Sequence, residues 1–295
     1  MSRRARFLAV LHRRPQVRTL LLLAPALGWL LVFFAVPLGI MATYAFRPRH
    51  ILGGVYPGWT TTQVARLFEP LYIAVLAKSV VLSACATALA LLISYPIALV
   101  IVRARRWRAL LLLLVVLPFW TSFLVRTFAM IFMLRDTGPI NQLLQFLGIA
   151  HAPLRMLYTP GAVVFGLVTG FVPFMVLPVY SSLEKLDPGL LEAAEALGAT
   201  AWRRFIRVIV PLTRPGAIAG SLLVFIPSLG SFLTSDLLGG ARVELIGNLV
   251  QNQFTSARNW PFGSALSLLL LAVVMLGVMV QVGWPRNDRS AGPLP

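Results

Sequence analysis

Residues 79–102 read SVVLSACATALALLISYPIALVIV and contain no charged side chain over 24 positions. An α-helix rises about 1.5 Å per residue, so about 20 apolar residues cross a hydrocarbon core about 30 Å thick. This stretch therefore predicts a transmembrane helix. Several such stretches could not be buried together in the core of a water-soluble chain of 295 residues.

Five further uncharged runs lie along the chain, at 19–46, 109–125, 156–183, 215–235 and 259–285. The whole chain is 58% hydrophobic and 12% charged, which excludes the soluble and disordered classes of protein. Its one cysteine, Cys85, excludes an internal disulfide. The run at 109–125 is short for a span, so we extend it past Arg126 into one helix over 109–133 that carries a buried or snorkelling arginine.

The predicted fold is an all-α integral membrane protein with one transmembrane unit over 19–284. A basic segment over 1–18 precedes this unit, a loop over 184–211 joins its fourth and fifth helices, and a tail over 285–295 ends the chain. Glycines spaced four residues apart, which allow two helices to approach closely, occur at Gly166 and Gly170 and at Gly216 and Gly220. The six helices are expected at about 19–46, 72–102, 109–133, 156–183, 212–236 and 261–284.

Basic residues are unevenly distributed between the two sides of the predicted membrane. The chain has 26 Lys and Arg and a net charge of +17, which would suggest a nucleic-acid partner if the protein were soluble. Most of these residues lie at the two termini and in the loops over 103–108 and 184–214, and loops that stay in the cytoplasm retain positive charge. We therefore predict cytoplasmic termini, basic loops at the anionic lipid surface and no nucleic-acid partner. The opposite side carries Arg47, Arg49, Arg66, Arg135, Arg155, Arg242 and Arg258.

The sequence has no arrangement of residues suited to covalent chemistry or metal binding. Its 3 histidines lie in separate segments outside the spans, without the spacing of metal ligands or of a Ser/His pair. Gly161 and Gly166 have the spacing of a phosphate-binding loop, but Leu167 and Val168 replace its lysine and hydroxyl residue. We predict no catalytic residue, no metal and no cofactor on this chain, so any ATP must be hydrolysed by a separate subunit.

The loop between the fourth and fifth predicted helices has the signals of two short helices. Asp187 can cap the first helix, and Gly198 supplies a left-handed stop after it. Thr200 can cap a second helix over 201–208, which Pro211 is expected to end before the fifth span. An amphipathic helix pair on the lipid head groups also accounts for these features, because a tryptophan and three arginines would suit that surface.

One part of this loop resembles a family motif. Glu192-Ala193-Ala194, three residues, Gly198, nine residues and Val208-Ile209-Val210-Pro211 are similar to the EAA loop of binding-protein-dependent ABC transporter permeases, with valines at two apolar positions. In that family the loop forms the coupling helix, which seats in a cleft of the ATPase subunit. The resemblance implies that the ATPase-coupling residues are Glu192, Ala193, Ala194, Gly198 and Pro211.

The resemblance covers most of the chain from about Pro118 to Gly263, and it is greatest to the spermidine/putrescine permeases. It implies a bacterial inner-membrane subunit with six helices, a second homologous permease subunit and a dimer of ATP-binding subunits that use ATP and Mg²⁺. It also implies a periplasmic polyamine-binding protein. Related permeases for other small organic solutes share the EAA loop. The stretches concerned are 118–121, 180–187, the EAA loop, 235–240 and 259–263.

Acidic and aromatic residues near the spans are candidates for contact with a polycation. Of 9 acidic residues only Asp236 borders a span, and we predict that it contacts a substrate ammonium, with Trp120 as a stacking wall. Alternatively, Asp236 caps the turn into 237–240. Arg126 would repel a polyamine, so we expect it to face an acid, a carbonyl or an interface. The outer segment 138–147 is a candidate docking surface for a binding protein.

Together these features predict a non-catalytic permease subunit of an ABC importer that carries spermidine and putrescine inward. One rival is the same type of permease for another small organic solute or ion. A second rival is a secondary transporter that works alone. The scarcity of acidic residues inside the spans and the EAA loop both disfavour the second rival.

Overall fold

The computed structural model describes residues 15–50 and 53–282, so most of the predicted segment 1–18 and the whole predicted tail 285–295 lie outside the described residues. The described part is helical, with one isolated antiparallel bridge between Arg49 and Val55 and no strand. Four helices are long and apolar enough to cross a membrane, and two bent helix pairs raise the possible number of spans to six. The predicted all-helical membrane fold is confirmed.

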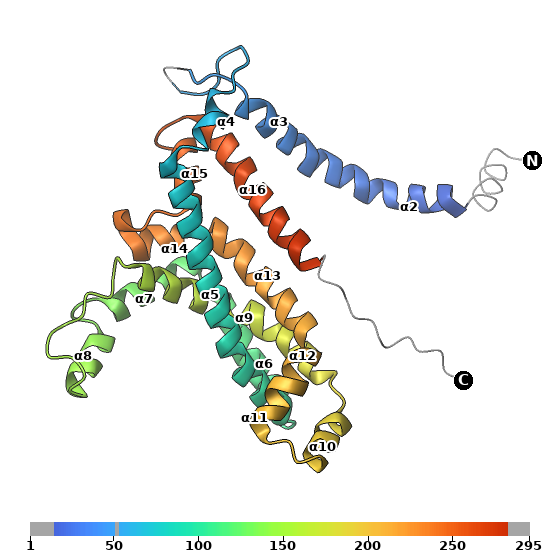
Figure 1. The fold of residues 1–295 in the computed structure, drawn as a ribbon. Helices are drawn as coiled ribbons and strands as arrows, with labels where there is room; N and C mark the ends of the chain where they lie inside the picture. The colour runs from blue at the N-terminus through green and yellow to red at the C-terminus, as the bar shows by residue number, and fades with distance from the viewer. Residues whose placement is uncertain (1–14, 51–52, 283–295) are drawn as a thin grey trace, which may run out of the picture.

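Three helices form the centre of the molecule (Figure 1): α5 (Pro70–Arg103), α9 (Pro160–Glu184) and α13 (Arg214–Gly230). The helix α5 buries a stripe of small residues, which recur about every four positions and therefore share one face. Small side chains on a shared face let the backbones of two membrane helices approach closely. The stripe contains Ser79, Ser83, Ala86, Ala90, Ser94 and Ala98.

Glycines bring α13 and the segment after it against α9. A Cβ added to Gly216 would lie 2.4 Å from the carbonyl oxygen of Pro178, and one added to Gly220 would lie 2.6 Å from the sulfur of Met175. A Cβ on Gly166 would lie 2.3 Å from a methyl group of Leu238. The predicted close approach is confirmed at these three glycines. It is wrong at Gly170, where an added Cβ would meet nothing within 4 Å.

The first span extends away from the central helices as an arm (Figure 1). It consists of α2 (Pro15–Leu30), the π-helical turn η1 (Leu31–Ala35) and α3 (Val36–Ala45). The π turn comes just before Pro37, which has no backbone N–H to donate to the preceding turn. Only the end of this arm is covered, because α3 packs against α16 (Trp260–Val282).

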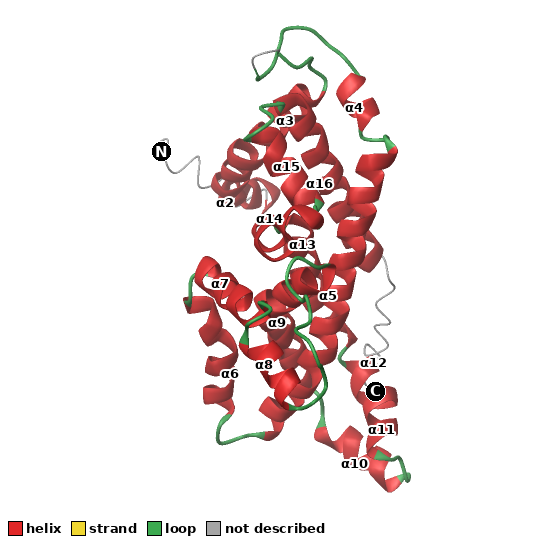
Figure 2. Ribbon diagram, turned by 90° about the vertical axis from the view of Figure 1, so that its left-hand side faces the viewer, coloured by secondary structure: helices red, strands yellow, loops and turns green. Residues whose placement is uncertain are grey.

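Short helices lie at both ends of the bundle (Figure 2). At one end α4 (Thr62–Arg66) and α15 (Ile246–Phe254) pack with α3 and α16 around Phe262, which is fully buried. At the other end the chain projects as a helical hairpin of α10 (Pro188–Ala196) and α11 (Ala201–Arg204). The hairpin and the α4 end are separated by the length of α5.

The third predicted span is not one helix, which corrects the expectation of a continuous helix over 109–133. The structure divides it into α6 (Arg108–Val116), the 3-10 turn η2 (Leu117–Trp120) and α7 (Phe123–Leu134), and the chain bends by 93° between the two halves. Thr121 and Ser122 are extended at this bend. The apolar pattern indicated burial in lipid, whereas Pro118 and the extended pair interrupt the helix.

The fifth span also differs from its predicted course over 212–236. Its helix α13 ends at Gly230, and Ser231 is extended before α14 (Phe232–Thr234) and the π turn η4 (Ser235–Gly239). Nor does Pro211 end the helix before this span. The chain continues from α11 through the π turn η3 (Phe205–Ile209) and α12 (Val210–Leu212), and it bends by 70° only at Thr213. A π turn before Pro211 accommodates the missing donor, as at Pro37.

Candidate coupling loop and substrate path

The predicted helix pair of the loop is present, and its caps are those expected. Asp187 is extended, and its carboxylate accepts a hydrogen bond from the backbone N–H of Gly189 at 2.9 Å. Thr200 caps α11 by accepting from the N–H of Arg203 at 3.4 Å. Gly198 has a φ of +77°, the left-handed conformation that glycine adopts without a steric cost. The sequence therefore determined the local structure of this loop.

The residues assigned to ATPase coupling lie on α10 and at the turn that follows it. Glu192 and Ala193 are exposed, Ala194 is half-buried, and a Cβ on Gly198 would meet nothing within 4 Å. Leu197, at the tip of the hairpin, is 89% exposed. Pro211 lies apart from this surface, because it belongs to α12 at the base of the loop. The hairpin thus presents an apolar tip beyond the last turn of α9.

Contacts at two places, across the hairpin and at its base, fix the return of the loop to the transmembrane helices. Arg204 forms an ion pair with Glu195 across the hairpin. At the base, the hydroxyl of Tyr95 on α5 lies 3.0 Å from the hydroxyl of Thr213, and both residues are buried. The ring of Tyr95 also meets Phe205 edge to face, with centroids 5.6 Å apart. The bend at Thr213 is therefore anchored to the longest helix of the protein.

A third contact fixes the start of the loop, and sequence analysis missed it. Arg108 begins α6, forms an ion pair with Glu184 and donates a hydrogen bond to the hydroxyl of Tyr180. Its guanidinium carbon lies 5.1 Å from the centre of the Tyr180 ring. Tyr180 and Glu184 are four residues apart on α9, so they share a face. A tyrosine and a glutamate spaced in this way can share one basic partner, but the spacing alone does not identify that partner as Arg108.

We expect Arg108→Gln to destabilise the protein by about 1 kcal/mol, because the ion pair with Glu184 is partly exposed and screened by solvent. The expected fall in melting temperature is about 2 °C. Thermal unfolding of the detergent-solubilised protein measures it, with Arg105→Gln as the matched control, since Arg105 is exposed and forms no ion pair among the described residues. An equal shift in both variants would contradict the role given to Arg108.

Asp236 lies in the π turn η4 and is exposed. One of its carboxylate oxygens accepts a hydrogen bond from the side-chain amide of Asn248 at 3.4 Å. The same amide nitrogen donates to the carbonyl of Phe232 at 3.0 Å. The turn itself is closed by the backbone, because the N–H of Gly240 donates to the carbonyl of Asp236. No backbone N–H in the described residues of this turn donates to the carboxylate of Asp236, so the alternative in which this carboxylate caps the turn is wrong.

The structure does not place Trp120 in a stacking wall with other aromatic rings, because it is 79% exposed on the turn η2. Its neighbour Phe119 instead meets Phe174 of α9 edge to face, with ring centroids 4.7 Å apart. The guanidinium of Arg126 lies 5.7 Å from the centre of the Phe119 ring, and its Nε and Nη1 are buried without a hydrogen-bond partner. Sequence analysis missed Phe174, and no acid or carbonyl of the described chain accepts from these two nitrogens.

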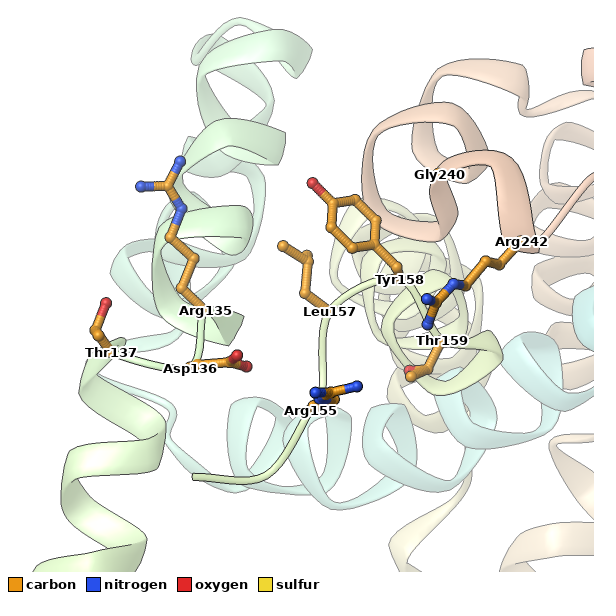
Figure 3. A pocket seen from close by; sticks show the side chains of 9 residues that line it. All are labelled: Arg135, Asp136, Thr137, Arg155, Leu157, Tyr158, Thr159, Gly240 and Arg242. Carbon is orange, nitrogen blue, oxygen red and sulfur yellow. The ribbon is translucent and has the colours of Figure 1, made fainter. Parts of the chain in front are cut away.

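A cavity of about 610 Å³ opens at the other end of α9 from the loop (Figure 3). It is lined by residues that come from three segments between helices, at 135–137, 155–159 and 240–242. A helix of 25 residues is about 37 Å long, so α9 separates this cavity from the coupling loop by more than the thickness of a hydrocarbon core. Among the described residues no group of three His, Cys, Asp or Glu could hold a metal ion.

Residues 90–284, more than half of the chain, match the model of a family described as binding-protein-dependent transport system inner membrane component. The chain therefore belongs to this family. It is a multi-pass inner-membrane permease subunit of an ABC importer, and the ATPase of such a transporter is a separate subunit.

Two spermidine/putrescine permeases are similar over most of the chain, and a molybdenum permease is similar over about half of it. The spermidine/putrescine transport system permease protein PotB of Escherichia coli (strain K12) is 43% identical over 87% of this chain and 93% of its own length. The protein of the same name from Haemophilus influenzae is 45% identical over 86% of this chain and 89% of its own. The molybdenum transport system permease protein ModB of Azotobacter vinelandii is 34% identical over 54% of this chain and 69% of its own length.

Solved structures share the fold. A bacterial ABC transporter that imports the acidic polysaccharide alginate superposes with a TM-score of 0.66 at 18% identity, over 95% of this chain and 100% of that one. The alginate transporter in complex with a pentasaccharide-bound periplasmic protein gives a TM-score of 0.71 at 17% identity, over 97% and 99% of the two chains. At these identities the match shows the fold of an importer permease and does not extend to the substrate.

Proposed function

We propose that this permease carries polyamines, spermidine and putrescine, into the cell as one half of the translocation path of an ATP-driven importer. The observation that supports this substrate is the identity of 43% to 45% to spermidine/putrescine permeases, which extends over most of both chains. The partners are a second homologous permease, a dimer of ATP-binding subunits that uses ATP and Mg²⁺, and a periplasmic polyamine-binding protein. This chain itself holds no cofactor.

In this proposal the hairpin of α10 and α11 seats in the ATPase subunit. Glu192, Ala193, Ala194 and Gly198 form the seating surface, and Leu197 adds an apolar tip that is 89% exposed in the isolated chain. An exposed leucine of this kind stabilises a complex when a partner buries it. The hairpin, both termini and the basic loops lie in the cytoplasm, which agrees with the charge distribution of the sequence.

Asp236 is proposed to contact a substrate ammonium in the path. Its carboxylate is exposed and makes a single long hydrogen bond, so it retains acceptor capacity for a cation. Trp120, which is largely exposed next to Phe119 of the Phe119–Phe174 pair, is proposed as a second contact. Pro211 supports the loop from its base, and Arg126, whose side chain as a whole is only half-buried, is proposed to lie near the second permease.

We expect Asp236→Asn to raise the spermidine concentration at half-maximal uptake about tenfold, because the charge is lost while the acceptor for Asn248 is kept. Uptake of labelled spermidine into vesicles measures it. Glu69→Gln is the control, because it removes another exposed acid, at the start of α5, that does not line the cavity. If Asp236→Asn takes up spermidine with unchanged rate and affinity, Asp236 does not contact the substrate.

The proposal as a whole is tested by co-purifying the chain with its neighbouring gene products and assaying ATP hydrolysis in lipid. Stimulation by the binding protein loaded with spermidine, and not by the empty protein, is the expected result. If the complex assembles but only another solute stimulates its ATP hydrolysis, the protein is an importer permease whose substrate is not a polyamine. The similarity to a molybdenum permease makes molybdate the first such solute to include. Failure to assemble with any ATPase would support a carrier that works alone.

A further inference from the structure

The cavity at the N-terminal end of α9 is lined by three arginines and one acid. Arg135 and Asp136 follow α7, Arg155 precedes α9, and Arg242 ends the 3-10 turn η5 (Gly240–Arg242). Figure 3 shows Asp136 directed toward the segment that carries Arg155, whereas Arg135 extends back along α7. The lining therefore carries an excess of positive charge on the side of the protein that has few basic residues.

Buried hydrogen bonds hold the segments of this cavity at a fixed separation. Asn141 is fully buried, and its amide nitrogen donates to the carbonyls of Arg135 at 3.1 Å and of Leu154 at 3.0 Å. Its amide oxygen accepts from the N–H of Leu154 at 2.9 Å. One side chain thus joins the segment that carries Arg135 to the segment that carries Arg155. Arginines on segments fixed in this way lose less freedom when a ligand binds.

Further contacts hold the segment that carries Arg242, the third arginine of the cavity. Tyr158 donates its backbone N–H to the carbonyl of Leu238 at 2.9 Å, and its ring lies so close to Gly240 that an added Cβ would approach to 2.8 Å. The hydroxyl of Ser235 donates to the carbonyl of Val243 at 2.5 Å. The ammonium of Lys78 donates to the carbonyl of Arg242 at 3.4 Å and adds a further positive charge. The cavity is therefore a preformed cationic site.

Among the residues that the structure describes, none forms an ion pair with the charges that line the cavity. The ion pairs of the described chain join Arg66 to Glu69, Arg108 to Glu184 and Arg204 to Glu195, and none involves the cavity. An excess of arginine would repel a polyamine, so this site does not suit the proposed cargo. Its chemistry fits carboxylates, to which arginine donates two parallel hydrogen bonds.

We propose that this cavity is the site where carboxylates of the periplasmic polyamine-binding protein dock. The inference rests on the proposed function. A protein that holds a polycation needs acidic side chains at its cleft, and the cationic cavity is complementary in charge to that rim. The cavity lies about 37 Å along α9 from the coupling loop, on the opposite face of the membrane from the ATPase. The predicted docking segment 138–147 borders this cavity, and its Asn141 joins two of the segments that line it.

Affinity of the labelled, spermidine-loaded binding protein for the assembled transporter in lipid nanodiscs tests this site. We expect Arg155→Gln and Arg242→Gln each to weaken binding about fivefold, and the double variant to weaken it about 25-fold. Asp136→Asn should tighten binding, because it removes the one negative charge of the lining. A loss of folding would weaken binding in every variant. Weaker binding in the arginine variants together with tighter binding in Asp136→Asn would therefore show that docking is electrostatic. Raising the salt concentration should weaken wild-type binding and reduce these differences.

Arg258→Gln is the matched control, because Arg258 is exposed on the same side but does not line the cavity. Wild-type affinity in the Arg155 and Arg242 variants would overturn the docking site and leave the importer intact. An effect seen only in nanodiscs with anionic lipid, or a loss of bound anionic lipid without a change in protein affinity, would assign the cavity to lipid phosphate instead. A wild-type complex that assembles with its ATPase but binds no such protein would refute both proposals.

Discussion

Leu197→Asp is expected to abolish ATP-driven uptake while the helical fold remains intact. Leu197 lies at the tip of the α10–α11 hairpin and is 89% exposed, so a charge there costs nothing in the isolated chain. In the proposed complex the same position is buried in the ATPase, where an unpaired carboxylate is strongly unfavourable. We expect the affinity for the ATPase subunit to fall about 100-fold or more. Co-purification of the two subunits and uptake in vesicles measure the effect.

The control for this change is Leu147→Asp, because Leu147 is also exposed and follows α8 (Pro139–Phe146), which lies beside the bundle and is not part of the hairpin. It should leave ATPase binding unchanged. Normal uptake by Leu197→Asp would show that the hairpin tip does not enter the ATPase. It would favour the interpretation of the loop as an amphipathic pair on the lipid surface.

Gly216→Ala is expected to have the largest effect on folding. Its new methyl group would lie 2.4 Å from the carbonyl oxygen of Pro178, an atom of the α9 backbone that cannot rotate away. The helices α9 and α13 would have to separate, at a cost of about 3 kcal/mol. The melting temperature and the yield of folded protein in detergent should both fall.

Gly170→Ala provides the matched comparison on α9 itself. An added Cβ at Gly170 would meet nothing within 4 Å, so the substitution should be neutral or slightly stabilising, since alanine favours a helix more than glycine does. Similar losses of stability in the two variants would show that the helix interior tolerates no change at all. They would contradict a specific contact between Gly216 and α9.

The spans could be predicted from the sequence because hydrocarbon selects for length and lack of charge, and 79–102 satisfies both conditions. The bends could not be predicted so well. The apolar character of 109–133 continues through Pro118 and through the extended pair Thr121 and Ser122, where the structure turns by 93°. Lipid solvates an apolar side chain equally on either side of such a bend, so composition does not report it.

The caps of the coupling loop were predicted because they depend on residues close in sequence. Asp187 and Gly198 act on backbone groups within a few positions, and both have the expected conformation. The contacts between Tyr95 and Thr213, and among Arg108, Tyr180 and Glu184, join distant segments, so no local pattern specifies them. The arginines that line the cavity likewise appear in the sequence as isolated charges, and only the fold brings them together.

The most direct measurement is net accumulation of labelled spermidine in proteoliposomes that contain this chain, its permease partner and the ATPase subunits. ATP is enclosed on the side of the hairpin, and the binding protein is added on the other side. The account predicts accumulation that requires ATP, the binding protein and an intact Leu197 together. Accumulation by this chain alone without ATP, or ATP-driven accumulation of a different solute with spermidine excluded, would contradict it.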